Sequence, residues 1–224
     1  MIICNTPTVE LIDSMGSDIT IVNAARVSFA KESEWKDEDA QALQDKDKKL
    51  IRYLSEHEHW SPFAHTAVQF RIKAPIFVAR QLAKHQVGGV WNEVSRRYVD
   101  TEPEFYFPKK WRVRPTDKKQ GSGGEHPASD ALTTAVCLNV AQIVVVYNQL
   151  VDDGIAPEQA RMILPQNMMT EWIWTGSLVF FARVCALRLT ADSQLESREV
   201  VEKISEAIQF STNLTYSWNQ LTKK

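Results

Sequence analysis

The chain has 224 residues, enough for one large domain, and its 44% hydrophobic and 24% charged residues are typical of a soluble globular protein. The formal net charge of −2 excludes a generally basic surface, so recognition of nucleic acid through such a surface is not expected. Any site for an anion must therefore be built from a local group of Arg and Lys residues.

The thiols and the N-terminus indicate a cytoplasmic protein. Cys4, Cys137 and Cys185 lie far apart without CxxC spacing, which favours a reducing compartment over a disulfide framework. Asn5 and Glu10 interrupt the apolar start of the chain, unlike the core of a signal segment. No apolar run approaches the roughly 20 residues that a transmembrane helix needs, so no membrane partner is expected.

In the first part of the chain, hydrophobic periodicity and breaker residues delimit short elements. They are an edge strand over 2–13, a helix over 18–26 with Asp18 as N-cap, a charged helix over 36–56, a loop over 57–65 and a half-buried strand over 66–73. In the last of these, Val68, Phe70 and Ile72 alternate with polar residues and should share one buried face.

The second part is predicted to be mainly helical. Its elements are a helix from Pro75 to about Gln86 stopped by Gly88-Gly89, a strand over 104–108, a flexible loop over 114–128, a helix over 129–152, a short helix over 157–163, a buried strand over 168–175, and helices over 177–188 and 195–217. Together they predict one α+β domain over 1–224, with an antiparallel sheet packed with several helices.

The segment 72–98 concentrates the polar chemistry of the chain. Arg80 and Lys84 are four residues apart, so they share one face of the predicted helix with Gln81 and His85. On the composition of the helix alone, a solvated helix face is the favoured explanation of this pattern. The following run, 92–98, contains a single aliphatic residue and offers both acceptors and forked guanidinium donors, which indicates a nucleotide site.

Three histidines surround the sequence Trp60-Ser-Pro-Phe. His57, His59 and His65 could supply three ligands to zinc, but a fourth ligand would have to come from elsewhere and no HExxH motif is present. Capping or core-edge histidines explain them more simply, and a ligand-lining loop is the functional alternative. No metal site is therefore predicted.

Three arginines stand in or beside apolar helices. Arg161, Arg183 and Arg188 must each find a partner or reach solvent. A structural ion pair or a side chain extending from a helix end is one explanation. The other is a guanidinium held in a low-dielectric site, where it acts strongly on a bound anion. The residues alone leave both open.

Taken in order, these segments resemble flavin-dependent thymidylate synthase. That family's pattern is a strand, "KAPIFVARQ", an Arg-His-Arg turn, a short spacer and "NE-x-S-x-RY". Here residues 73–81 match the first motif, Lys84-His85-Gln86 stands at the turn, and 92–98 match the last. Further similar segments are 24–28, the "H-x-[ST]-P-F-x-H" loop at 59–65, the "ARxxLP" element at 160–165 and the C-terminal helix region at 175–196.

The resemblance implies synthesis of dTMP from dUMP, with methylenetetrahydrofolate as carbon donor, FAD as cofactor and NADPH as reductant, in a homotetramer whose sites are shared between subunits. It places Arg188 as the catalytic residue. The residues implied for dUMP are Gln81, Glu93, Ser95, Arg96, Arg97, Arg161 and Arg188. Those implied for FAD are Ser28, His59, Ser61, Lys84, His85, Gln86, Glu93, Ser177 and Arg183.

The implied chemistry agrees with the residues. C5 of uracil is a weak nucleophile, and no cysteine lies in a polar setting that would activate it covalently. An arginine beside the pyrimidine can instead stabilise the charge that develops as N3 ionises.

Several departures from the family pattern concern the expected flavin contacts. Lys84 keeps the charge of the usual arginine but lacks its fork, and Gln86 loses a charge. The spacer over 87–91 is one residue longer than usual. Ser177, Val179 and Arg183 stand where Asn, Arg and Asn are common, so Arg183 is hypothesised to replace a lost cation. A non-catalytic flavin- or nucleotide-binding oligomer is therefore the alternative function.

Overall fold

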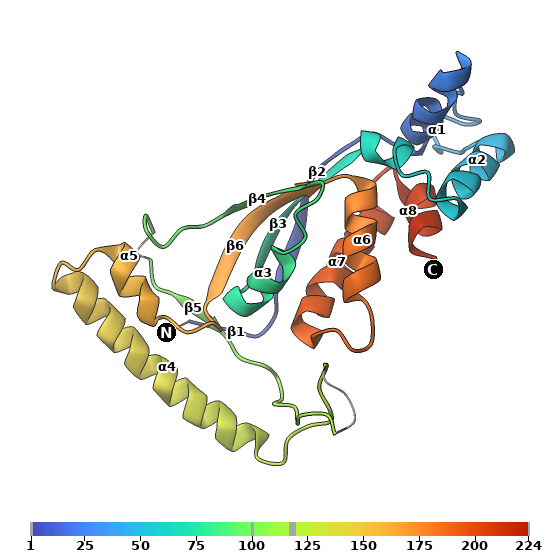
Figure 1. Ribbon diagram of the computed structural model, residues 1–224. Coiled ribbons are helices and arrows are strands. Elements are labelled where there is room, and N and C mark those ends of the chain that lie inside the picture. Colours follow the sequence, from blue (N-terminus) through green and yellow to red (C-terminus); the bar gives the residue numbers. More distant parts are fainter. Residues whose placement is uncertain (1, 100, 117–119, 224) are drawn as a thin grey trace.

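The computed structural model describes residues 2–99, 101–116 and 120–223 (Figure 1). Its strands are β1 (Ile2–Cys4), β2 (Thr8–Met15), β3 (Ala67–Pro75), β4 (Gly89–Glu93), β5 (Glu104–Tyr106) and β6 (Met169–Gly176). Its helices are α1 (Asp18–Arg26), α2 (Asp45–Glu56), α3 (Ile76–Leu82), α4 (Ser129–Asp152), α5 (Pro157–Ala160), α6 (Leu178–Arg188), α7 (Leu195–Ser211) and α8 (Thr215–Thr222). Short 3-10 turns cover Val27–Phe29, Pro62–His65 and Arg161–Ile163.

A four-stranded antiparallel sheet forms the centre of the molecule, in the order β2-β3-β6-β4. The period-two pattern of β3 explains why this strand lies inside the sheet: Val68, Phe70 and Ile72 share one face and are fully buried there. Trp172 and Trp174 of β6 are buried beside them. The α+β class with an antiparallel sheet and several helices is therefore confirmed. A second sheet pairs β1 with β5 in parallel.

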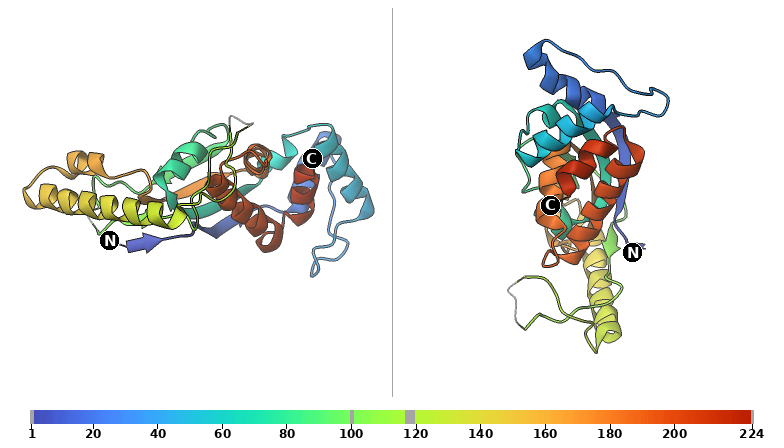
Figure 2. Two further views of the ribbon diagram at one scale, coloured as in Figure 1. Left: turned by 90° about the horizontal axis from the view of Figure 1, so that it is seen from below. Right: turned by 90° about the vertical axis from the view of Figure 1, so that its right-hand side faces the viewer.

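Helices α3, α6 and α7 lie along the sheet, while α1, α2 and α8 gather at one end (Figure 1). α7 contacts β2, β3, α3 and α6, which closes the main hydrophobic core. The molecule is elongated, with α4 at the end opposite α1 and α2 (Figure 2). This arrangement leaves α4 with few neighbours in its own chain.

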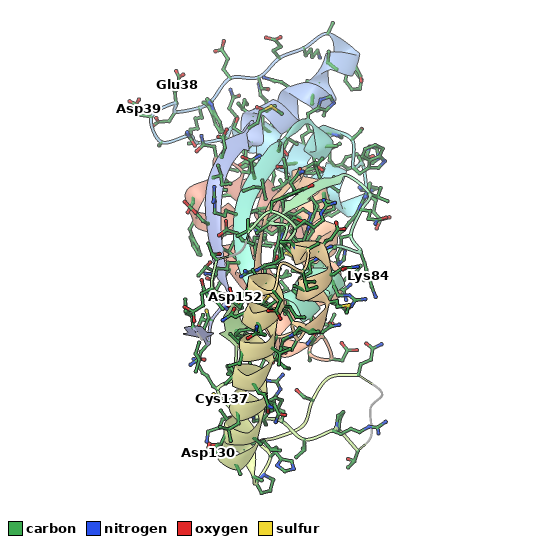
Figure 3. The ribbon with its side chains drawn as sticks, turned by 90° about the vertical axis from the view of Figure 1, so that its left-hand side faces the viewer. Glu38, Asp39, Lys84, Asp130, Cys137 and Asp152 are labelled. Carbon is green, nitrogen blue, oxygen red and sulfur yellow. The ribbon has the colours of Figure 1, made fainter. Side chains whose placement is uncertain are left out.

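Helix α4 is the least covered long element. Val140, Val144 and Tyr147 are buried on its inner face, whereas Leu138 and Val145 on the opposite face are 68% and 67% exposed. Figure 3 shows the helix along its length, from Asp130 past Cys137 to Asp152. Among the described residues it is the one helix long and apolar enough to cross a bilayer by length and composition, and 17% of its apolar window is buried. Thr, Asn and Gln residues interrupt its apolar run, so a helix was predicted here but not a membrane-spanning one.

Several predicted boundaries were wrong for local reasons. The helix predicted over 36–56 begins only at Asp45, because a bridge between Asp37 and Ala42 turns the chain first. The final helix predicted over 195–217 is divided into α7 and α8. The helix that starts after Pro75 ends at Leu82 instead of reaching residue 86.

The prediction that the Gly88-Gly89 pair stops the helix was wrong, because α3 already ends at Leu82. Gly89 is the first residue of β4 and is paired with Gly176 of β6. The ring of Phe180 lies over both residues, and a Cβ on either would overlap it. Gly89 is therefore required by a close approach between a strand and a side chain.

The prediction that Asp18 caps its own helix was also wrong. Ser17 is the N-cap of α1, and its side chain and that of Thr20 form a capping box. The buried carboxylate of Asp18 instead accepts hydrogen bonds from the backbone N–H groups of Tyr216 and Ser217, at 2.9 and 2.8 Å. Asp18 thus provides hydrogen-bond acceptors for free N–H groups in the first turn of α8, which is far away in the sequence.

Candidate functional site

A cavity of about 320 Å³ opens where β4 ends beside the turn that follows α5. It is lined by Glu93 and Arg96 from the segment after the glycine pair and by Arg161 from the 3-10 turn. Lys73 and Glu104 also line it and form an ion pair at 2.7 Å. The cavity thus includes the carboxylate of Glu93 and two guanidinium donors, groups that a nucleotide can use, together with further carboxylates from Glu102, Glu104 and Glu171.

The carboxylate of Glu93 is held by a hydrogen bond at each oxygen. The hydroxyl of Thr170 donates to Oε1 at 2.7 Å, and the indole N–H of Trp91 donates to Oε2 at 3.2 Å. Both donors are rigid, because Thr170 lies in β6 and the Trp91 ring stacks on Trp172 with centroids 4.4 Å apart. Glu93 is therefore oriented before any ligand arrives.

The segment after Glu93 directs its two arginines differently. Arg96 donates to the carbonyl oxygen of Thr101 and lines the cavity. Arg97 donates through Nε to the hydroxyl of Ser95 at 3.1 Å and lies 4.9 Å from the ring centre of Tyr98. Arg97 and Ser95 therefore support each other at the surface, outside this cavity.

A second group of predicted residues lies between α3 and α6. Arg188 donates through Nε to Nε2 of His85 at 2.9 Å and through Nη2 to the backbone carbonyl of Gln81 at 3.5 Å. Burial, and then the charge of Arg188, lower the pKa of His85 below its usual value. None of these residues lines the cavity that contains Glu93.

A third group lines a cavity of about 310 Å³ between the 58–63 segment and α6. Its polar groups come from Ser55, Glu58, His59 and Arg183, and Trp60 and Val179 contribute to an apolar wall. Within the described part of the chain, Arg183 has no recorded hydrogen bond or ion pair. An unpaired guanidinium beside an exposed indole suits an anionic ligand that also has an aromatic ring.

The remaining candidates lie outside both cavities. Ser177 is engaged in structure, since its hydroxyl accepts from the N–H of Phe180 and caps α6. Lys84 points outward at the edge of the molecule in the view of Figure 3. The others are exposed: Ser28, Ser61 and Gln86. Thr170, Trp91 and Lys73 were not among the predicted site residues. Two of them carried a signal: Thr170 is a polar residue in a strand predicted to be buried, and Lys73 begins the motif at 73–81.

The structure does not bring the three histidines considered as possible zinc ligands into one group. No group of three or more His, Cys, Asp or Glu side chains suited to a metal ion occurs in the described ranges. His57 instead contacts the carbonyl of Tyr53 through Nδ1 at 2.9 Å and stacks on its ring.

Solved structures with this fold define the class of protein. A UMP/dUMP methylase, PolB from Streptomyces cacaoi, bound with 5-Br dUMP, superimposes with a TM-score of 0.83 at 29% identity over 98% of this chain and 97% of the other. The same methylase bound with 5-Br UMP gives a TM-score of 0.83 at 27% identity, covering 99% and 97% of the two chains. The fold is therefore that of a nucleotide methylase.

The family follows from sequence comparisons. The family model described as thymidylate synthase complementing protein matches residues 10–210. Flavin-dependent thymidylate synthase of Thermus thermophilus is 38% identical over 210 residues, which cover 93% of this chain and 74% of that protein. The enzyme of the same name from Kosmotoga olearia is 34% identical over 212 residues, covering 93% and 87%. The chain belongs to the flavin-dependent thymidylate synthase family, as its motifs indicated.

Proposed function

We propose that this protein converts dUMP to dTMP with FAD as cofactor, methylenetetrahydrofolate as carbon donor and NADPH as reductant. The single observation that carries the proposal is the cavity at the end of β4, where an oriented carboxylate and two guanidinium groups face one space. The base of dUMP has one N–H group, at N3, that can donate to the carboxylate, and its phosphate can accept from the guanidinium groups. The family relationship supports the same reaction.

In this proposal Glu93 accepts a hydrogen bond from the nucleotide, while Arg96 and Arg161 bind its phosphate. Gln81, Ser95 and Arg97 complete the contacts to dUMP. Arg188 is the catalytic residue: its guanidinium stabilises negative charge on the uracil ring and so makes C5 more nucleophilic. Because the charge develops during the reaction, this interaction is strongest in the transition state.

The residues proposed for FAD fit such a group. The unpaired guanidinium of Arg183 and the neighbouring His59 suit its anionic part, and the Trp60 side of the same cavity suits a ring. Ser28, Ser61, Lys84, His85, Gln86, Glu93 and Ser177 are the other proposed contacts. When bound, FAD supplies the hydride transfer that completes the methyl group, and the protein orients it and limits access of water.

We further propose that the site is completed by another copy of the chain, in a homotetramer. Arg161, Arg188 and Arg183 lie in three separate groups of residues on one chain. The exposed apolar face of α4 offers a surface that another copy could cover. We propose that the 224 residues act as one domain, in the cytoplasm, without nucleic-acid or membrane partners.

One assay tests the reaction. Purified protein is incubated with dUMP, methylenetetrahydrofolate, NADPH and FAD, and dTMP is measured by chromatography. We expect dTMP that disappears when FAD is omitted or when Arg188 is replaced by Ala. Binding of FAD without any dTMP would instead favour the non-catalytic flavin-binding oligomer, and normal turnover of Arg188→Ala would overturn the role of that residue.

A further inference from the structure

The contact between α3 and α6 fixes one side of the Arg188 guanidinium. Its Nε donates to Nε2 of His85 at 2.9 Å, and its Nη2 reaches the carbonyl of Gln81 at 3.5 Å. Arg188 lies in the last turn of α6 and is half-buried, so water cannot readily replace both partners. The protein thereby holds this edge of the guanidinium and leaves Nη1 available.

This geometry determines the protonation state of His85. An arginine side chain stays protonated in proteins, so the hydrogen between the two groups belongs to Nε of Arg188. Nε2 of His85 must then carry a lone pair, which makes the ring neutral with its proton on Nδ1. A second proton on the imidazole would place two cations in contact and remove the acceptor.

We propose that His85, as a neutral acceptor, is a positioning residue that orients Arg188, and that protonation of His85 releases the guanidinium. The inference rests on the role proposed above for Arg188. It also gives His85 a task other than lining the flavin. The two tasks are compatible, because Nδ1–H has no hydrogen-bond partner among the described residues and can still donate to a bound group.

The surroundings of His85 favour the neutral ring. From α6 the charged group that faces it is Arg188, and in its own segment Lys84 is an exposed cation. No carboxylate contact to its ring is recorded in the described ranges. Burial first, and the charge of Arg188 second, lower the pKa of His85 below 6.5. The state in which neutral His85 orients the Arg188 guanidinium is thus present at neutral pH, and it is lost as the pH falls through the lowered pKa of His85.

The protonation state can be measured without any turnover. NMR of the protein labelled with 15N in its histidine rings should show five imidazoles, and His85→Gln identifies the resonance of His85. We expect a neutral Nδ1–H ring at pH 7 that titrates below 6.5, and a higher pKa in Arg188→Met. A cationic ring at pH 7, the Nε2–H tautomer, or a pKa unaffected by Arg188→Met would overturn the proposal.

Kinetics then separate positioning from a merely structural role. His85→Ala should lower kcat for dTMP formation by on the order of 10–100-fold with a smaller change in KM for dUMP, because a misplaced group costs rate. His85→Gln keeps an acceptor oxygen and should recover most of kcat while losing the acid limb of the pH profile. His57→Gln is the matched control and should behave like the wild type.

The outcomes distinguish this proposal from the proposed function. A wild-type protein that forms no dTMP would refute the function, while the NMR measurement would still decide the state of His85. If the wild type is active and His85→Ala matches it at every pH, the positioning role is refuted and the function stands.

Discussion

The hydroxyl of Thr170 donates to Oε1 of Glu93 at 2.7 Å, across the β4–β6 pair. Trp91 engages the other oxygen of the same carboxylate from within β4. Thr170 belongs to no motif recognised in the sequence, yet its position sets the direction in which Glu93 faces the cavity at the end of β4.

Replacing Thr170 by Val should therefore weaken dUMP binding. Valine has nearly the same shape but leaves Oε1 of Glu93 without its donor, and loss of one hydrogen bond to a charged group corresponds to about 1.5–3 kcal/mol. We expect Kd for dUMP, measured by calorimetry, to rise about tenfold or more, because 1.4 kcal/mol corresponds to a factor of ten. Thr170→Ser retains the donor and should bind nearly as the wild type does. An unchanged Kd in Thr170→Val would show that Glu93 is oriented without this contact.

Arg161 allows a test specific to the phosphate. Arg161→Ala should raise Kd for dUMP by on the order of 10–100-fold, the magnitude of a lost charge-assisted hydrogen bond. The Kd of the nucleoside deoxyuridine, which has no phosphate, should not change. Arg198→Ala removes a cation from α7, outside the three groups of site residues, and serves as the control. Equal losses for nucleotide and nucleoside would mean that Arg161 does not bind the phosphate.

The absence of a cysteine nucleophile from the proposed mechanism is also testable. Burial raises the pKa of the Cys185 thiol to about 12, so it should resist alkylation in the native state. Cys4 and Cys137 are less buried, and none of the three thiols lines the Glu93 cavity. Treatment with iodoacetamide at pH 8 should modify Cys4 and Cys137, seen by peptide mass spectrometry, and leave dTMP formation intact. Loss of activity in the triple Ser variant with its fold preserved would reinstate a thiol mechanism.

Much of the fold was predictable because its signals are local. The alternation of Val68, Phe70 and Ile72 identified the central strand, and residues 129–152 were predicted as the helix that forms α4. Some boundary errors had local causes, such as the bridge between Asp37 and Ala42, but two other errors arose where distant contacts decide the structure. Asp18 satisfies N–H groups of α8, and Gly89 accommodates the ring of Phe180. Neither relationship has a sequence spacing that could reveal it.

The sequence yielded a list of candidate site residues but no indication of how the fold groups them. Glu93, Arg96 and Arg161 share a cavity although more than 60 residues separate the first from the last. Arg188 lies apart from them, against His85. Sequence similarity indicates which residues matter to a family, but the separation of these groups depends on how β4, α5 and α6 pack, which is a tertiary property.

Asp18 offers a test of the long-range cap. Asp18→Ala leaves the N–H groups of Tyr216 and Ser217 without acceptors in a buried setting, which should lower the free energy of unfolding by about 1–3 kcal/mol. Denaturant unfolding followed by circular dichroism measures the change. Asp13→Ala, at an exposed position in β2, should have little effect. Equal stability of Asp18→Ala and the wild type would mean that water replaces the carboxylate at the start of α8.

Sharing of the site between copies predicts complementation between two inactive variants. At dUMP concentrations well below the raised Kd of Arg161→Ala, that variant and Arg188→Ala should each lose nearly all dTMP formation when expressed alone. If one site takes Arg161 from one copy and Arg188 from another, random hybrids of the two variants have about a quarter of their sites with both native arginines. Co-expressed hybrids purified through two tags should therefore regain about a quarter of wild-type activity. The double variant Arg161→Ala/Arg188→Ala, co-expressed with either single variant, provides the control, because none of its hybrids can assemble such a site. Hybrids that stay inactive, although sedimentation shows an intact oligomer, would mean that both arginines act within a single copy. In that case α6 would have to move toward β4 to bring the two groups together.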